Sequence, residues 1–127
     1  MQHHRCEDAP APGGPYSPAV SAAGLLYLSG QRPVDPATGQ LVEGIVAQSR
    51  QVLTNLITVL RSCGCTAADV VKVQVHLADI ADFAAFNAVY TEFFQDPYPA
   101  RTTVGSVLRG ILVEIDLVAA MPVPAAR

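Results

Sequence analysis

The stretch from Val70 to Leu77 constrains the fold most, because apolar and polar residues alternate along it. The sequence separates two series: Val71, Val73, Val75 and Leu77 in one, and Lys72, Gln74 and His76 in the other. A period of two is typical of a β-strand with one face on a core. The segments on either side follow a helical period instead. A strand between two helices, in a chain of 127 residues, predicts a single two-layer α+β domain.

Two predicted helices flank this strand. From about Ile45 to Cys63 apolar residues recur every three or four positions, and Gly64 is a residue type that often follows a helix end. The second helix begins at Asp79, which can cap the free amides of the first turn. It continues into an aromatic stripe that indicates packing on a sheet: Phe83, Phe86, Tyr90, Phe93 and Phe94. Asn87 lies on or beside that stripe, where a buried amide needs partners, so it is a site candidate.

Three further segments have β character: Leu25 to Ser29, 102–108 and 111–120. Asp35-Pro36-Ala37-Thr38-Gly39 predicts a tight turn between two short extended segments, because proline presets φ and glycine accepts the left-handed angle. With the strand at residues 70–77, these segments predict a mixed sheet with both helices on one face.

The second face of this sheet has no helix left to cover it. Apolar residues nevertheless occur in both alternation classes, especially at 25–28 and 112–118. A second copy of the chain is the economical cover, so we expect a closed homo-oligomer with sites at its interfaces. Glu114 and Asp116 share one face of the last strand among apolar neighbours, where a carboxylate must be paired, raised in pKa or solvated.

The segment from Asp96 to Gly105 joins the second helix to a strand and carries Arg101. Pro97 and Pro99 fix φ and remove backbone donors, so the helix has to end before them. A guanidinium at such a stiff junction suits a planar carboxylate, to which it can donate two parallel hydrogen bonds. From this segment alone, a surface arginine that caps a turn is the alternative.

Composition argues against several classes of protein. A net charge of −3 gives no reason to expect a nucleic-acid partner. No apolar run approaches the roughly 20 residues that span a bilayer, and no basic region precedes an apolar one at the N-terminus. The three cysteines, Cys6, Cys63 and Cys65, fit no secreted disulfide framework. We therefore expect a cytoplasmic protein in which Cys63 and Cys65 are small, buried or half-buried thiols.

The predicted domain organisation has three parts: a flexible N-terminal arm at 1–13, a single domain at 14–121 and a tail at 122–127. The arm contains Ala9-Pro10-Ala11-Pro12-Gly13-Gly14 and shows no periodicity. His3, His4 and Cys6 lie on it without a second ligand cluster, so we expect no metal site.

Seven short segments resemble the RidA (YjgF) family of reactive-intermediate, or imine, deaminases. In chain order they are Gly14-Pro15-Tyr16-Ser17-Pro18-Ala19-Val20, Leu28-Ser29-Gly30-Gln31, 51–56, 69–73, 83–90, Pro99-Ala100-Arg101 and Val113-Glu114-Ile115. The resemblance runs from about Gly14 to Met121. It implies a chorismate-mutase-like fold, with two helices on one face of a mixed sheet, and a homotrimer with sites in the clefts between subunits. The implied activity is cofactor-free hydrolysis of 2-imino acids, such as 2-iminopropanoate and 2-iminobutanoate, to 2-oxo acids and ammonia.

The resemblance also implies roles for individual residues. Arg101 matches the family's carboxylate-binding arginine, Tyr16 a tyrosine that borders the pocket, and Glu114 the glutamate that positions or activates the attacking water. Asn87, Ser29 and Gly30 match pocket-lining positions. Thr103 stands where many archetypal members have a cysteine. A threonine at this position can make a polar contact to the substrate but supplies no thiol. The chain therefore resembles a non-archetypal subgroup of the family.

Two other functions stay open at this point. The chain can be a non-catalytic trimer that binds small carboxylates, as a sensor or a chaperone-like partner. It can also be a pathway-specific deaminase that acts on a larger enamine, since the segment between Arg101 and Glu114 looks slightly shorter than in archetypal members.

Overall fold

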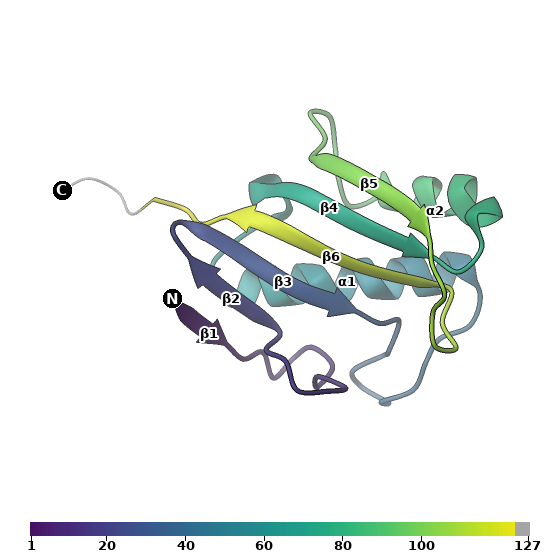
Figure 1. The fold of residues 1–127 in the computed structure, drawn as a ribbon, viewed down its shortest axis with the longest axis horizontal. Coiled ribbons are helices and arrows are strands. Elements are labelled where there is room, and N and C mark those ends of the chain that lie inside the picture. The colour runs from purple at the N-terminus through teal and green to yellow at the C-terminus, as the bar shows by residue number, and fades with distance from the viewer. Residues whose placement is uncertain (124–127) are drawn as a thin grey trace.

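The computed structural model describes residues 1–123 and shows, over these residues, a six-stranded sheet with two α-helices against one face (Figure 1). The strands are β1 (Gln2–His4), β2 (Ala19–Ala22), β3 (Leu25–Gln31), β4 (Val70–Leu77), β5 (Ala100–Gly105) and β6 (Val113–Ala120), and the helices are α1 (Ile45–Ser62) and α2 (Phe83–Tyr90). Their order in the sheet is β1-β2-β3-β6-β4-β5, with β4 and β5 parallel and the other pairs antiparallel. The predicted α+β fold with a mixed sheet is confirmed.

The core lies between the sheet and the helices. Alternate residues of β4 and β6 point into it and are at most 2% exposed: Val73, Val75 and Leu77 on β4, and Val113, Ile115, Leu117 and Ala119 on β6. The helices contribute fully buried side chains from their inner faces, including Val52, Leu56 and Val59 of α1 and Phe86 of α2. Because each buried aliphatic or aromatic side chain stabilises the fold by roughly 1.5–3 kcal/mol, this layer fixes how helices and sheet pack.

Val71 departs from the predicted pattern. It was assigned to the core series of β4, yet it is 48% exposed, so this assignment was wrong. The pairing of β4 with β6 changes register between Val70 and Lys72, which is a β-bulge. A bulge inserts one extra residue, so the alternation that holds from Val73 onwards does not extend back to Val71.

The N-terminus also differs from the sequence-based expectation of an arm without regular structure. β1 pairs antiparallel with β2, and His4 Nε2 lies 2.9 Å from Ser21 Oγ. Neither strand was predicted. β1 is three residues long and polar, so no apolar alternation marks it, and β2 is four residues long, too short for a clear pattern of its own.

The bounds of α1 are close to those predicted, whereas α2 begins later and ends earlier than expected. α1 ends at Ser62 with Cys63 as its C-cap. Before α2, Asp79 accepts a hydrogen bond of 2.9 Å from Ala81 N and caps a 3₁₀ turn at Ile80–Asp82. α2 is shorter than the aromatic stripe suggested, because Phe94 lies beyond its end and stacks on Tyr90 with the ring centroids 4.7 Å apart.

The segments outside the helices agree less well. β5 and β6 are shorter or shifted relative to the predicted 102–108 and 111–120. The two extended segments around the turn at residues 35–39 reduce to one isolated bridge between Val34 and Leu41.

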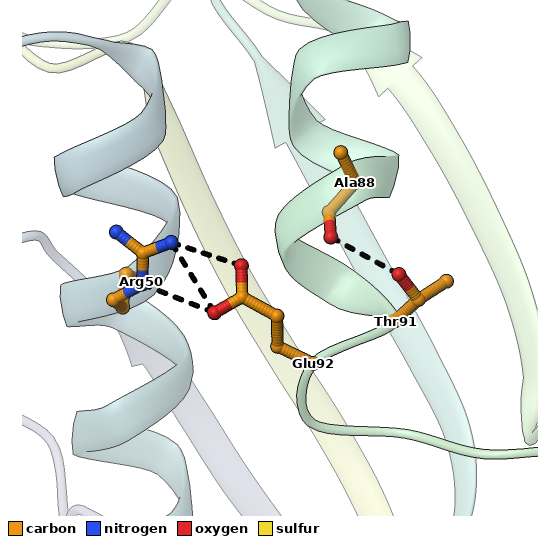
Figure 2. A network of polar contacts seen from close by, with 4 residues as sticks. All are labelled: Arg50, Ala88, Thr91 and Glu92. Carbon is orange, nitrogen blue, oxygen red and sulfur yellow. Dashed lines mark hydrogen bonds and ion pairs between the residues drawn. The ribbon is translucent and has the colours of Figure 1, made fainter.

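An ion pair joins the two helical segments on their outer side (Figure 2). Arg50 of α1 donates to both carboxylate oxygens of Glu92, with a closest distance of 2.9 Å, just after α2. Next to it, Thr91 Oγ1 donates to the carbonyl oxygen of Ala88 at 3.0 Å. Both charged side chains are about half exposed, 50% and 47%, so solvent screens the pair and it adds little to stability.

Among residues 1–123, no helix covers the opposite face of the sheet (Figure 1). Tyr27, His76, Glu114 and Asp116 lie on it, since cross-strand partners point to the same side. Burial raises the pKa of Asp116, and His76 Nε2, 3.9 Å from its Oδ2, acts against that shift. The expectation that a carboxylate here is paired or raised in pKa is confirmed for Asp116. Between residues 1 and 123, no helix is long and apolar enough to cross a bilayer.

Candidate functional site

Arg101 lies on the helix side of the edge strand β5. It pairs in register with Val73 of the parallel strand β4, so both side chains point towards the helices. Its guanidinium carbon lies over three aromatic rings of α2, 4.7 Å from the ring centroid of Tyr90 and 5.6 Å from those of Phe83 and Phe86. These cation–π contacts hold the positive charge on an apolar platform.

Asn87 fixes the same guanidinium from the side. Arg101 Nη2 donates a 2.7 Å hydrogen bond to Asn87 Oδ1, across 14 residues of sequence. This bond occupies one of the several N–H donors of the guanidinium and leaves others for a ligand. The structure therefore brings together Arg101 and Asn87, two of the predicted site residues.

Two buried hydroxyls lie near this pair. Thr103 is two residues after Arg101 and pairs in register with Val75, so it points to the same side of β5. Thr103 Oγ1 and the hydroxyl of Tyr90 are buried without a hydrogen-bond partner among the described residues. Burial also raises the pKa of Tyr90, an effect that the charge of Arg101 partly offsets. An unpartnered buried hydroxyl costs about 1–3 kcal/mol, so a polar ligand beside Arg101 would be stabilised here.

The N-terminal residues of the predicted site form a separate group. Ser29 Oγ donates to the carbonyl oxygen of Ser17 at 2.6 Å, and Ser29 N donates to the carbonyl oxygen of Pro18 at 3.0 Å. The Tyr16 hydroxyl accepts a 3.1 Å bond from Gly13 N, and the side chain is 45% exposed. Ser29 was predicted to line the pocket. In the structure its hydroxyl group donates a hydrogen bond to the segment that carries Tyr16.

Gly30 and Glu114 are in contact within this second group. A Cβ placed on Gly30 would lie 3.2 Å from Glu114 Cδ and closer still to Oε1. Any larger residue at this position would displace the carboxylate. The register of β3 with β6 shifts between Leu28 and Gln31, which lets the backbone of Gly30 pass beside Glu114.

The two groups lie on opposite sides of the sheet within one chain. Arg101 shares the side of Val73, whereas Glu114 pairs with His76, and these two β4 residues are an odd number of positions apart. A single chain therefore brings Arg101, Asn87 and Thr103 together, and separately Tyr16, Ser29, Gly30 and Glu114. It does not bring Arg101 next to Glu114.

Sequence reasoning missed the role of the aromatic rings under Arg101. The stripe on α2 was assigned to core packing, and Phe86 and Tyr90 are indeed buried. The spacing of the aromatic residues shows that they share one face of the helix. It does not show which strand packs against that face, and Arg101 comes from such a strand, β5.

The cysteines and histidines add no second site. Cys63 is half-buried and Cys65 is buried, both are free thiols, and burial raises the pKa of each. This confirms the prediction of small packed thiols. Among residues 1–123, no three His, Cys, Asp or Glu side chains are grouped as a metal ion would require.

Comparison with known proteins gives the family. Residues 6–121 match the family model described as endoribonuclease L-PSP. The 2-iminobutanoate/2-iminopropanoate deaminase of Capra hircus is 47% identical over 87% of this chain and 83% of its own length. A RutC family protein of Pyrococcus horikoshii is 45% identical over 89% of this chain and 92% of its own. The chain therefore belongs to the endoribonuclease L-PSP family, which is the RidA (YjgF) family that its sequence resembles.

A solved structure agrees with this assignment. Escherichia coli TdcF with bound serine superposes with a TM-score of 0.90 at 31% identity, over 96% of this chain and 100% of its own. The fold and the family are thus shown. The names within the family range from a deaminase to an endoribonuclease, so the activity has to be argued from the site.

Proposed function

We propose that this protein is a cofactor-free hydrolase of reactive 2-imino acids, with 2-iminopropanoate and 2-iminobutanoate as model substrates. The observation that carries the proposal is the guanidinium of Arg101, held over three rings and fixed by Asn87 with donors left over. A small imino acid is an anion with its reactive C=N carbon next to the carboxylate. A receptor that fixes the carboxylate therefore also fixes the electrophilic carbon.

The names of relatives support this choice over other anions. A relative with 47% identity is named as a deaminase of two small 2-imino acids, and a solved structure of the same fold is described with bound serine. Both names mention small molecules with an α-carboxylate, which is the group that Arg101 binds in this proposal.

The reaction needs water and a base, and Glu114 is the candidate for the base. In this proposal Glu114 takes a proton from water as the water oxygen bonds to the carbon of the protonated imine, and the electron pair of the C=N bond moves to nitrogen. Glu114 then gives this proton to the nitrogen of the carbinolamine. The C–N bond breaks and releases ammonia while the hydroxyl group loses its proton to Glu114 and becomes the C=O of the 2-oxo acid, so one water is consumed for each ammonia released. In the same proposal, Thr103 donates a hydrogen bond to the substrate beside Arg101 or accepts one from it, which its buried, unpartnered Oγ1 supports. Tyr16 borders the pocket.

The protein acts as a homotrimer in this proposal. Arg101 and Glu114 lie on opposite sides of the sheet in one chain, and β5, which carries Arg101, is an edge strand. A complete site therefore requires the Arg101–Asn87 group of one copy to face the Tyr16–Gly30–Glu114 group of a neighbouring copy.

Replacement of Arg101 tests the proposal directly. An amino-acid oxidase generates the imine of alanine in situ, catalase removes peroxide, and semicarbazide traps the imine that survives. We expect the wild-type protein to suppress semicarbazone formation, and Arg101→Ala to lower kcat/KM about 100-fold or more, because the carboxylate loses its charge-assisted contact.

Arg50→Ala is the matched control, since Arg50 is half exposed and pairs with Glu92 on the outer side of the helices. It should leave the rate unchanged. Equal rates for Arg101→Ala and wild type would refute the role of Arg101. Binding of 2-oxo acids by the wild-type protein without any turnover would indicate a carboxylate-binding protein instead of an enzyme.

A further inference from the structure

An open cavity of about 930 Å³ adjoins the Tyr16–Gly30–Glu114 group. It lies between the N-terminal segment and the loop that follows β3, and Tyr16 and Gly30 are both part of its wall. Pockets for drug-sized ligands measure roughly 300–1,000 Å³, so this cavity holds far more than the small side chain of 2-iminopropanoate. Its size requires an explanation beyond the smallest imino acids.

The wall of the cavity is positively charged although the whole chain is acidic. Arg5 and Arg32 line it, against a single carboxylate, Glu7. Neither arginine forms an ion pair with a carboxylate within residues 1–123. The chain as a whole carries a net charge of −3. Two arginines that are not neutralised within a cavity favour an anionic group there.

The backbone at Arg32 is held in place from the core. Asn55 of α1 is 1% exposed and donates both amide hydrogens to this loop, to the carbonyl oxygen of Arg32 at 3.2 Å and to that of Val34 at 2.9 Å. Its own Oδ1 accepts a 2.9 Å bond from Gln51 Nε2. A buried amide whose partners are all present fixes the loop, so Arg32 leaves the sheet from a defined position on the cavity wall.

We propose that Arg32, assisted by Arg5, binds a second carboxylate at the end of the substrate side chain, so that the protein accepts 2-imino acids derived from dicarboxylic amino acids. This inference rests on the proposed function and specifies its substrate class. The α-carboxylate lies on Arg101 of one copy, the imine carbon lies near Glu114 of the next, and the side chain extends past Gly30 into the cavity. Asn55 is a positioning residue, because it acts only through the backbone at Arg32.

The test compares two imines made in situ, one from alanine and one from glutamate, with semicarbazide as the trap. We expect the wild-type protein to hydrolyse both. Arg32→Ala should lower the ratio of kcat/KM for the glutamate imine to that for the alanine imine about tenfold or more, since one charge-assisted contact is lost. Arg32→Lys should restore part of that ratio, and Arg32→Glu should lower it further through repulsion.

Arg61→Ala is the matched control, because Arg61 is exposed on α1 and lines a different groove. It should leave the ratio as in the wild type. If the alanine imine is hydrolysed while the ratio is the same in Arg32→Ala, Arg32→Glu and wild type, this inference is overturned and the proposed function stands. If neither imine is hydrolysed by the wild-type protein, the proposed function fails first.

Discussion

Asp116 is a carboxylate whose surroundings favour its neutral form. It lies on the uncovered face of β6, where burial raises its pKa and His76 offsets only part of that effect. The folded state therefore binds a proton at Asp116 more tightly than the unfolded state. Its contribution to stability is present below the unfolded pKa of about 3.9 and is lost as the pH rises through the folded pKa.

Asp116→Asn should consequently stabilise the protein at pH 7, because the amide removes a charge that burial disfavours. The gain should be below about 1 kcal/mol, since the Asp116 side chain is 43% exposed and solvent screens it. The gain should shrink as the pH falls and wild-type Asp116 becomes protonated. Urea unfolding at pH 7 and near pH 4, at one protein concentration, measures this, with exposed Glu43→Gln as the control. A variant that is less stable than wild type at pH 7 would show that the attraction to His76 dominates.

The sequence indicates which residue types suit a binding site, but it does not show on which face of the sheet each side chain lies. Arg101 and Asn87 were each predicted as site residues, and a 2.7 Å hydrogen bond joins them in the structure. That Arg101 and Glu114 lie on opposite faces could not be read from the sequence. The face of a side chain depends on strand register, and a shift of one residue reverses it.

Asn55 links α1 to the loop after β3 through two hydrogen bonds, so its replacement should weaken the packing of one element on another. Asn55→Ala leaves the carbonyl oxygen of Val34 without its amide donor and opens a small void beside a buried helix. We expect the free energy of unfolding to fall by about 1–3 kcal/mol. Thr54→Ala, at an exposed position of the same helix, should change it by less than about 0.5 kcal/mol. Denaturant unfolding compares the two, and similar losses in both would contradict the role of Asn55.

The elements with a strong period were the ones that the sequence predicted well. β4 and α1 have nearly the predicted bounds, because many residues contribute to each pattern. β1 has three polar residues and no pattern of its own, so only its pairing with β2 makes it a strand. α2 ends before the stripe does because Phe94 reaches the core from a turn, a tertiary effect that spacing alone does not show.

Residues 1–123 leave one face of the sheet without a covering helix, and that face combines apolar and charged groups. Tyr27 of β3 pairs with Val118 of β6 across it, and Tyr27 is 47% exposed. The helices cover only the other side (Figure 1). In the proposed homotrimer, neighbouring copies cover this face, and the Arg101 of one copy meets the Glu114 of another. The mass of the particle and the activity are therefore expected to change together.

Sedimentation of the wild-type chain should therefore give a particle of roughly three times the 13.4 kDa monomer mass. Val118→Arg places a charge on the uncovered face and should shift the particle towards the monomer, because an unpaired charge cannot be buried between copies. It should also abolish imine hydrolysis, since the two halves of the site separate. Val46→Arg, at an exposed position on α1, is the matched control and should keep both mass and activity. A monomeric wild-type protein that still hydrolyses imines would contradict the composite site, because one chain holds Arg101 and Glu114 on opposite sides of its sheet.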